Sequence, residues 1–168
     1  MTERRTIRKW FFVWDFDKEE QWLNEMAMNG WALCSVGFCT YTFERCEPGQ
    51  YMIRLEMHGP DEDYIRFMEE TGCEYVGRVF QWIYFRRSAE YGEFDIFSDI
   101  DSRIAHLNRI ATAILLIAVA NLLIGFMNVS IGTRLGSVNL ILASLLTYGL
   151  GRIHGKIEAL EKERFFRE

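Results

Sequence analysis

The sequence is poor in the residues that metal sites and catalytic centres use. It contains 3 histidines and 4 cysteines, and the cysteines never form a CxxC pair, so neither a zinc site nor a redox dithiol is expected. A glycine-rich phosphate loop, a GxSxG nucleophile turn and an HExxH pair are all missing. We therefore expect free thiols, no catalytic residues, no metal and no cofactor, and we expect that the protein is not an enzyme.

Clustered positive charge is also missing. The net charge is −5, and the acidic excess lies within residues 1–90. Proteins that bind DNA or RNA need grouped cations to neutralise phosphates, so nucleic acid is not expected as a partner. The first residues are charged and aromatic where a signal peptide would have an apolar core, so no secretory leader is expected.

Two long apolar runs contrast with this acidic background. Residues 110–127 and residues 135–151 contain no Asp, Glu, Lys, Arg or His. As helices, each would extend roughly 25 Å, which is close to the thickness of a bilayer core. A short turn joins them, so the pattern predicts a transmembrane hairpin over residues 110–151. Neither run has an ionisable group of the kind that lines ion or proton pathways.

The cations around these runs predict the orientation of the hairpin. Arg103 and Arg109 precede the first run and Arg152 follows the second, whereas the turn between them has only Arg134. Cations are retained on the cytoplasmic side, so both termini are expected in the cytoplasm of a multi-pass protein of the cell (inner) membrane. The expected segments are a cytosolic domain (1–90), a linker and juxtamembrane helix (91–109), the hairpin (110–151) and a cytosolic helical tail (152–168).

Small and amide side chains recur along both runs. Ridges of small residues let helices approach closely in lipid, and an amide can hydrogen-bond across the contact. The expected packing residues are Ala118, Asn121 and Gly125 in the first run and Ala143, Thr147, Gly151 and Gly155 in the second. They would serve either to close the hairpin or to pair it with a second copy.

The domain before the hairpin contains an internal repeat. Residues 8–45 align with residues 50–87 without a gap. Each half has an aromatic and β-branched run, a helical segment that ends at a glycine, and a second long run. The expected strands are 8–15, 32–45, 50–57 and 74–87, and the expected helices end at Gly30 and Gly72. This βαββαβ order predicts an α+β domain with a ferredoxin-like fold, in which a four-stranded antiparallel sheet carries both helices on one face.

The other face of such a sheet would be open and aromatic. Alternation along the strands places on it Trp10, Phe12, Trp14, Arg54, Phe80, Trp82 and Tyr84. An exposed apolar patch of this kind usually marks a contact surface. A second copy, the linker or the tail of the chain would cover it, or it would bind a protein or peptide partner, stack nucleic-acid bases, or line a small-molecule pocket.

One stretch is distinctive beyond these patterns. The run from Lys9 to Trp31 has Trp22-Leu-Asn-Glu-Met in its helical segment, and Tyr41-Thr-Phe-Glu44, Tyr64 and Trp82-Ile-Tyr-Phe-Arg86 follow it. Over about residues 7–105 the chain resembles the bacterial family catalogued as domain of unknown function 2812. The resemblance implies a bacterial membrane protein with C-terminal spans, whose gene neighbours that of a PadR-type transcriptional regulator. It implies no catalytic residues.

These features favour a membrane-anchored binding or regulatory module that recruits a protein or peptide partner through its aromatic sheet face. There are two alternatives. One is a structural membrane protein that associates with itself and has no external ligand, and the other is a cytosolic sensor of a small ligand. The expected partners are the lipid bilayer and a protein, which is either foreign or a second copy of the chain.

Overall fold

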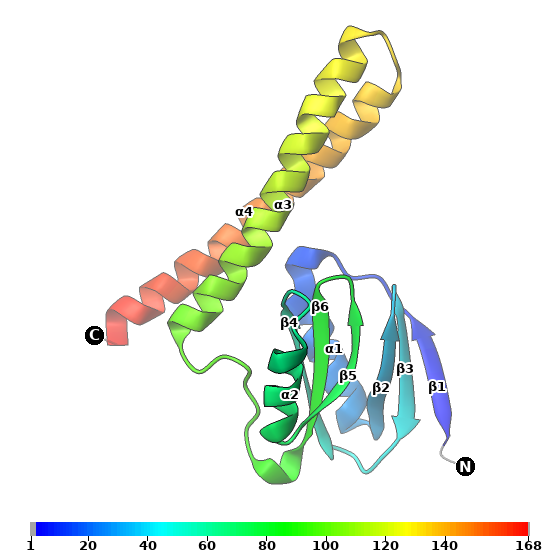
Figure 1. Cartoon of the computed structure of the whole chain (residues 1–168), viewed down its shortest axis with the longest axis vertical. Coiled ribbons are helices and arrows are strands. Elements are labelled where there is room, and N and C mark those ends of the chain that lie inside the picture. The colour runs from blue at the N-terminus through cyan, green and yellow to red at the C-terminus, as the bar shows by residue number, and fades with distance from the viewer. Residues whose placement is uncertain (1–2, 168) are drawn as a thin grey trace. The chain divides into compact units, whose positions relative to one another are not determined.

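The computed structural model describes the backbone of residues 3–167 and divides the chain into two compact units. The N-terminal unit ends at Ile96 and the C-terminal unit begins at Phe97. Figure 1 shows the first unit as strands and short helices and the second as a pair of long helices. The expected α+β class is confirmed, because helices and strands alternate along the first unit.

The N-terminal unit is built from two halves, each made of a strand, a helix and a β-hairpin. The first half comprises β1 (Arg4–Arg8), the short 3-10 helix η1 (Val13–Asp15), α1 (Phe16–Met28), β2 (Trp31–Gly37) and β3 (Thr40–Arg45). The second comprises β4 (Tyr51–Met57), α2 (Glu62–Glu70), β5 (Cys73–Val79), β6 (Trp82–Ser88) and the 3-10 helix η2 (Ala89–Tyr91). The strands form a first sheet with the order β1-β3-β2 and a second sheet with the order β4-β6-β5, both antiparallel.

Each long strand expected from the sequence is a β-hairpin in the structure. The segment 32–45 reverses at Phe38 and Cys39, and the segment 74–87 reverses at Phe80 and Gln81. Cys39 and Phe80 have φ values of 52° and 54°, and positive φ is typical of tight hairpin turns. The prediction of one four-stranded ferredoxin-like sheet is therefore wrong. The two residues of each turn are not glycine, asparagine or aspartate, so no residue typical of a tight turn marks either position.

The first strand lies earlier in the chain than the repeat predicts. β1 pairs with β3 from Arg4 opposite Glu44 to Arg8 opposite Thr40, so residues 9–15 form the connection to α1 and not a strand. Their aromatic composition serves ring packing instead, as Phe11 shows by its contacts with the rings of Trp22 and Tyr41. Aromatic and β-branched residues favour strands because they fit a half-buried surface. The connection over residues 9–15 provides such a surface as well, so the same residues occur there without forming a strand.

The second sheet is covered on both faces. Along β6, Tyr84 joins the apolar cluster beneath α1, whereas Ile83 and Phe85 join a cluster with Met68 of α2. In Figure 1 the two helices lie on opposite sides of the strands. Leu55 lies directly opposite Tyr84 in the β4–β6 ladder, and both side chains are buried. The predicted open face, which included Tyr84 but not Leu55, is therefore absent from this sheet.

A side-chain amide closes the outer edge of the second sheet. The Asn24 amide on α1 donates to the carbonyl of Ile53 in β4 (2.9 Å) and accepts from the Ile53 N–H (2.9 Å). The Leu55 N–H donates to the Glu20 carboxylate (3.2 Å). These contacts occupy the edge at which another strand would otherwise pair. They give a structural role to Asn24, which lies in the distinctive helical segment that begins at Trp22.

Replacing Asn24 with alanine is expected to destabilise the protein by about 2–3 kcal/mol. The change leaves the part-buried N–H and C=O of Ile53 without their partner, and each unpaired group costs about 1–3 kcal/mol. Urea denaturation followed by tryptophan fluorescence measures the loss. Asn29→Ala is the matched control, because the Asn29 amide donates to the Glu25 carbonyl at an exposed position. An equal loss in the two variants would contradict the role of Asn24.

The C-terminal unit is a helical hairpin. α3 (Ile100–Ser130) begins with a capping box, in which Asp99 accepts from the Ser102 N–H (2.7 Å) and Ser102 accepts from the Asp99 N–H (3.4 Å). A turn that contains Gly132 at a φ of 75° leads into α4 (Leu135–Arg167). Within the described residues, α3 is the one helix that is long and apolar enough to cross a membrane.

Glycine and alanine let α3 and α4 approach each other closely. A Cβ at Gly125 would lie 2.9 Å from a side-chain carbon of Leu140, and one at Gly136 would lie 2.8 Å from the backbone nitrogen of Val129. A side chain at Gly136 would meet backbone and force the helices apart, whereas one at Gly125 would require the Leu140 side chain to shift. Ala118 of α3 and Ala143 of α4 are buried as well.

Asn139 of α4 adds polar contacts to this seam. It donates to Asn121 (3.2 Å) and accepts from Asn128 (3.3 Å), both on α3. In contrast, Gly151 and Gly155 have open space where a Cβ would lie, and Thr147 donates to the Ala143 carbonyl of its own helix (2.9 Å). These three expected packing residues do not form the close contact within the hairpin. The residues at the contact between α3 and α4 recur at alternating intervals of three and four residues, as in a coiled coil, and not at a constant interval of four residues.

Candidate functional site

Four exposed aromatic side chains gather at one end of the N-terminal unit. The exposed fractions are 59% for Trp10, 40% for Phe12, 63% for Phe38 and 78% for Phe80. Phe38 lies in the turn between β2 and β3 and Phe80 in the turn between β5 and β6, whereas Trp10 and Phe12 lie in the connection from β1 to α1. We call these four residues the aromatic surface.

The rings of the aromatic surface form a continuous row. Trp10 lies edge-to-face with Phe12 at 6.0 Å and with Phe38 at 5.8 Å, and Phe38 lies edge-to-face with Phe80 at 5.8 Å between ring centres. Phe12 stacks on the buried ring of Trp14 at 4.7 Å. Such pairs have favourable geometry beyond simple burial, so the row has a defined arrangement although its outer face is exposed.

The internal repeat explains how the row is assembled. Phe38 and Phe80 coincide when the two halves are aligned, and each lies in the turn of its own hairpin. Trp10 is brought to the same end because the pairing of Arg8 with Thr40 is followed by a hydrogen bond from the Lys9 N–H to the Cys39 carbonyl (3.1 Å). The surface therefore combines both hairpin turns with the connection before α1.

The structure separates the seven predicted contact residues. Trp10, Phe12 and Phe80 lie in the aromatic surface, and the buried Trp14 lies directly beneath Phe12. The other three do not belong to it, because Arg54 lies 3.6 Å from Glu20, Trp82 packs on Phe16 at 5.5 Å, and Tyr84 is buried. Phe38 was missed, although its alignment with Phe80 was a signal for it.

A buried carboxylate lies at the centre of the N-terminal unit. Glu19 of α1 accepts hydrogen bonds on one oxygen from the hydroxyls of Tyr41 in β3 (2.8 Å) and Tyr84 in β6 (2.6 Å), and all three side chains are buried. Burial raises the pKa of Glu19 above its ordinary value, although the two hydroxyls act in the opposite direction. Burial and the neighbouring carboxylate raise the pKa of Tyr41 and of Tyr84. This cluster was not predicted, because a glutamate in the first turn of a helix is usually an exposed charge that favours the helix N-terminus.

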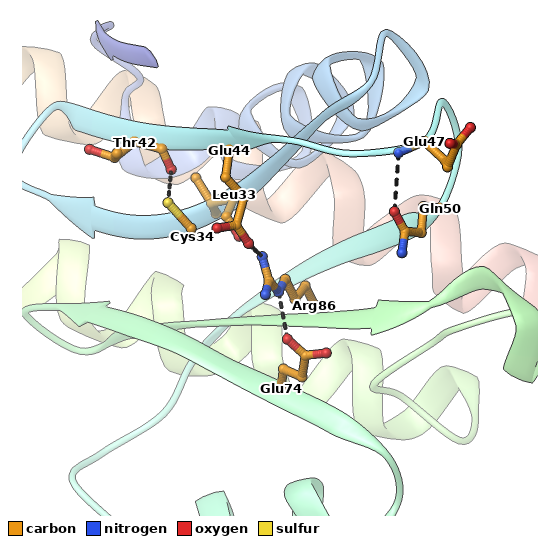
Figure 2. A network of polar contacts seen from close by, with 8 residues as sticks. All are labelled: Leu33, Cys34, Thr42, Glu44, Glu47, Gln50, Glu74 and Arg86. Carbon is orange, nitrogen blue, oxygen red and sulfur yellow. Dashed lines mark hydrogen bonds and ion pairs between the residues drawn. The ribbon is translucent and has the colours of Figure 1, made fainter. Parts of the chain in front are cut away.

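Arg86 of β6 bridges the two sheets, as Figure 2 shows. Its guanidinium donates to Glu44 of β3 (2.7 Å) and to the Leu33 carbonyl of β2 (3.1 Å), and to Glu74 of β5 in its own sheet (2.7 Å). It also lies 4.6 Å from the centre of the Tyr51 ring. Burial acts to lower the pKa of Arg86, but the hydrogen bonds to Glu44 and Glu74 outweigh it, so the pKa lies above its ordinary value.

Two of the four cysteines lie in surroundings that make them unreactive. Burial raises the pKa of the Cys34 and Cys46 thiols, which makes both poor nucleophiles at neutral pH. The Cys34 thiol donates to the Thr42 carbonyl (3.3 Å; Figure 2). In the part of the chain that the structure describes, no three His, Cys, Asp or Glu side chains are grouped so that they could hold a metal ion.

Comparison with known proteins gives one match. The model of the family described as "Protein of unknown function (DUF2812)" matches residues 15–119, which run from the start of α1 into the middle of α3 and include Phe38 and Phe80 but not Trp10 and Phe12. No curated protein and no solved structure matches the chain. The resemblance noted around Trp22 is thus confirmed, and the chain belongs to the DUF2812 family.

Proposed function

We propose that the protein is a membrane-anchored binding module, in which the aromatic surface recruits a protein partner and the helical hairpin holds the module at a bilayer. The observation that carries this proposal is the row of four exposed rings. Large rigid aromatic side chains bury much area at low entropic cost, and they dominate the binding energy of protein interfaces. Exposed apolar patches of this kind are uncommon on soluble surfaces without a partner.

The helical hairpin supports the membrane part of the proposal. Large apolar side chains are exposed on both helices between residues 115 and 148, among them Leu116, Leu123, Phe126, Val138, Ile141 and Leu145. Water is a poor environment for such a surface, whereas lipid is a good one. The amides of the seam are paired with each other, as polar side chains within a bilayer need to be.

The hairpin would accordingly enter the membrane with α4 beside α3. α4 is less apolar than α3, and its polar Asn139 is shielded by contacts with α3. Charged residues are concentrated at the end of the hairpin away from its turn, where Arg164 pairs with Asp101 (2.8 Å). Cations at this end favour a multi-pass bacterial membrane protein with both termini in the cytoplasm.

Membrane fractionation tests the anchor. We expect the full chain, expressed in a bacterium, to remain in the membrane pellet after extraction with alkaline carbonate, because the apolar surface of the hairpin has no aqueous partner. A peripheral protein of known behaviour in the same lysate serves as the control. Release of the chain into the supernatant together with that control would contradict the membrane anchor. It would not bear on binding through the aromatic surface.

Recruitment is tested by chemical crosslinking in native membranes, followed by affinity purification and mass spectrometry. We expect a foreign protein that is recovered with the native chain and lost with the double variant Trp10→Ala/Phe80→Ala. Phe67→Ala is the matched control, because Phe67 is similarly exposed on α2 but lies outside the aromatic surface. Recovery of the chain alone would favour the alternative of a self-associating membrane protein and would contradict recruitment.

A further inference from the structure

Three of the four sheet edges in the N-terminal unit are closed. The outer edge of β4 is hydrogen-bonded to Asn24 and Glu20 of α1. The edges of β2 and β5 lie against each other, since a Cβ at Gly77 of β5 would lie 3.0 Å from a methyl of Val36 in β2. The fourth edge belongs to β1, which Figure 1 shows at the outer side of the first sheet. Within the described residues, no strand pairs with this side of β1.

The backbone of β1 presents hydrogen-bonding groups to the open side. At the two ends of its ladder with β3, the Glu3 carbonyl accepts from the Arg45 N–H (3.0 Å) and the Lys9 N–H donates to the Cys39 carbonyl (3.1 Å). The register between these ends has no bulge, and in an antiparallel pair every second residue bonds to the neighbouring strand. The residues whose N–H and C=O groups point away from β3 are therefore Arg4, Thr6 and Arg8.

The side chains of β1 make this edge strongly cationic. Three of its five residues are arginine, and four of the five are exposed. Arg4 and Arg8 share one face of the strand with Thr6, because side chains alternate along a strand. Arg5 lies on the other face with Ile7, which packs against the apolar cluster beneath α1. A segment that pairs with β1 would thus meet cations on both of its faces.

The three arginines of β1 have no acidic partner in the described part of the chain. Glu44 lies directly opposite Arg4 in the ladder, but its carboxylate pairs with Arg86 at 2.7 Å. No ion pair joins an arginine of β1 to another described residue. The unit as a whole is acidic, so β1 concentrates unneutralised positive charge at its one open sheet edge.

This charge determines which segments the edge can accept. Open edges bind extended peptides through main-chain hydrogen bonds, and the side chains opposite each other set the specificity. A second copy of β1 paired antiparallel about Thr6 would place Arg4 opposite Arg8, and like charges at such positions repel. Carboxylates at the same positions would be attracted, so the edge rejects its own copy and selects an acidic strand.

We propose that the open edge of β1 binds an extended acidic segment of another protein as an added antiparallel strand. The backbone of this segment would bond to the outward N–H and C=O groups of β1. Carboxylates opposite Arg4 and Arg8 would lie four residues apart on one face of the added strand. A third carboxylate, opposite Arg5, would lie on the other face beside an apolar side chain opposite Ile7.

This binding edge is separate from the aromatic surface and does not depend on it. β1 continues directly into the connection that carries Trp10 and Phe12, so one protein with an acidic strand next to an apolar side chain could contact both. Each site nevertheless has its own test. If Trp10→Ala/Phe80→Ala retained the foreign protein, recruitment through the aromatic surface would be contradicted and the β1 edge would still stand.

A fluorescent peptide tests the β1 edge in the purified full chain, held in micelles of a neutral detergent. The peptide places glutamates opposite the three arginines, valine opposite Ile7 and threonine opposite Thr6, and its control has lysines in place of the glutamates. Fluorescence anisotropy should show binding of the acidic peptide and none of the lysine peptide. Bound peptide should also slow hydrogen exchange at the amides of Arg4, Thr6 and Arg8, because these N–H groups would become hydrogen-bonded.

Methylation of single peptide amides distinguishes an added strand from attraction to charge alone. The peptide amide opposite Thr6 would face β1, whereas the one opposite Ile7 would face away. A methyl group on the first should weaken binding by about tenfold or more, and one on the second should have little effect. Equal effects of the two methyl groups would overturn the proposal. So would equally tight binding of a single-stranded oligonucleotide of the same charge.

Exchange of charges gives the matching test on the protein. Arg5→Glu/Arg8→Glu should lose the acidic peptide and bind a peptide with lysines at the two corresponding positions. These two arginines lie opposite uncharged residues of β3, so the variant creates no like-charged pair within the sheet. Lys18→Glu/Arg66→Glu changes the net charge equally at positions outside β1 and should bind the acidic peptide as the native chain does. Retention of the acidic peptide by Arg5→Glu/Arg8→Glu would overturn the proposal.

Discussion

Replacement of Arg86 with methionine is expected to lower the free energy of unfolding by about 2–3 kcal/mol. Removal of one member of a buried, hydrogen-bonded charge cluster costs about 3–5 kcal/mol. The expected loss is smaller here, because the Glu74 side chain is 51% exposed and regains water when Arg86 is absent. Glu44, which is 24% exposed, and the Leu33 carbonyl carry most of the penalty. Methionine keeps much of the aliphatic volume, so the loss reports the guanidinium.

Chemical denaturation of the purified full chain measures this effect. Arg66→Met is the control, because Arg66 is 67% exposed and lies 3.5 Å from an exposed Asp63 on the same helix. Surface ion pairs of this type contribute roughly 0–1 kcal/mol. Equal losses in the two variants would show that Arg86 does not join the two sheets as the structure describes.

Replacement of Glu19 with glutamine is expected to change how stability depends on pH. Burial raises the pKa of Glu19 above 4.5 in the folded protein, so the folded state holds this proton more tightly than the unfolded chain does. The stabilisation from the bound proton is complete below about pH 4 and is lost as the pH rises through the folded-state pKa. One such proton gives a slope of up to about 1.4 kcal/mol per pH unit.

Glutamine has no proton to lose, and its amide oxygen still accepts from Tyr41 or Tyr84. The Glu19→Gln variant should therefore gain stability over the native chain as the pH rises above the pKa of an unfolded glutamate and through the raised folded-state pKa of Glu19. Denaturation midpoints at a series of pH values measure the difference. Glu25→Gln is the control, because Glu25 is an exposed residue of the same helix that accepts from Gln21 (3.0 Å). A constant difference between Glu19→Gln and the native chain at every pH would contradict the burial of an ionisable carboxyl.

The sequence predicted the parts of the fold that local chemistry controls. Gly30 and Gly72 end α1 and α2 with positive φ, as expected, and the two apolar runs are helices. The prediction of single long strands was wrong at Phe38-Cys39 and Phe80-Gln81, where the chain reverses without a residue typical of tight turns. A period of two continues through such a turn, so alternation alone cannot distinguish one long strand from a hairpin.

The candidate site was predicted only in part, for the same reason. Trp10, Phe12 and Phe80 were predicted as site residues because they were expected to share one face of a sheet. In the structure they lie close together for another reason: the β5–β6 turn and the connection from β1 to α1 meet at one end of the unit. Tyr84 was placed on the outer face, since nothing in the sequence indicates that α1 and α2 cover opposite faces. The burial of Glu19 could not be predicted, because its two hydrogen-bond partners, Tyr41 and Tyr84, lie 22 and 65 residues away in the chain.

Recruitment through the aromatic surface is tested most directly by photo-crosslinking in living cells. A photoreactive phenylalanine analogue is placed at position 80 in one strain and at position 67 in another, since both side chains are exposed but only Phe80 lies in the aromatic surface. We expect a discrete crosslinked foreign protein from position 80 and none from position 67. Crosslinks from position 80 to lipid or to the chain itself alone, with no foreign protein, would contradict the account.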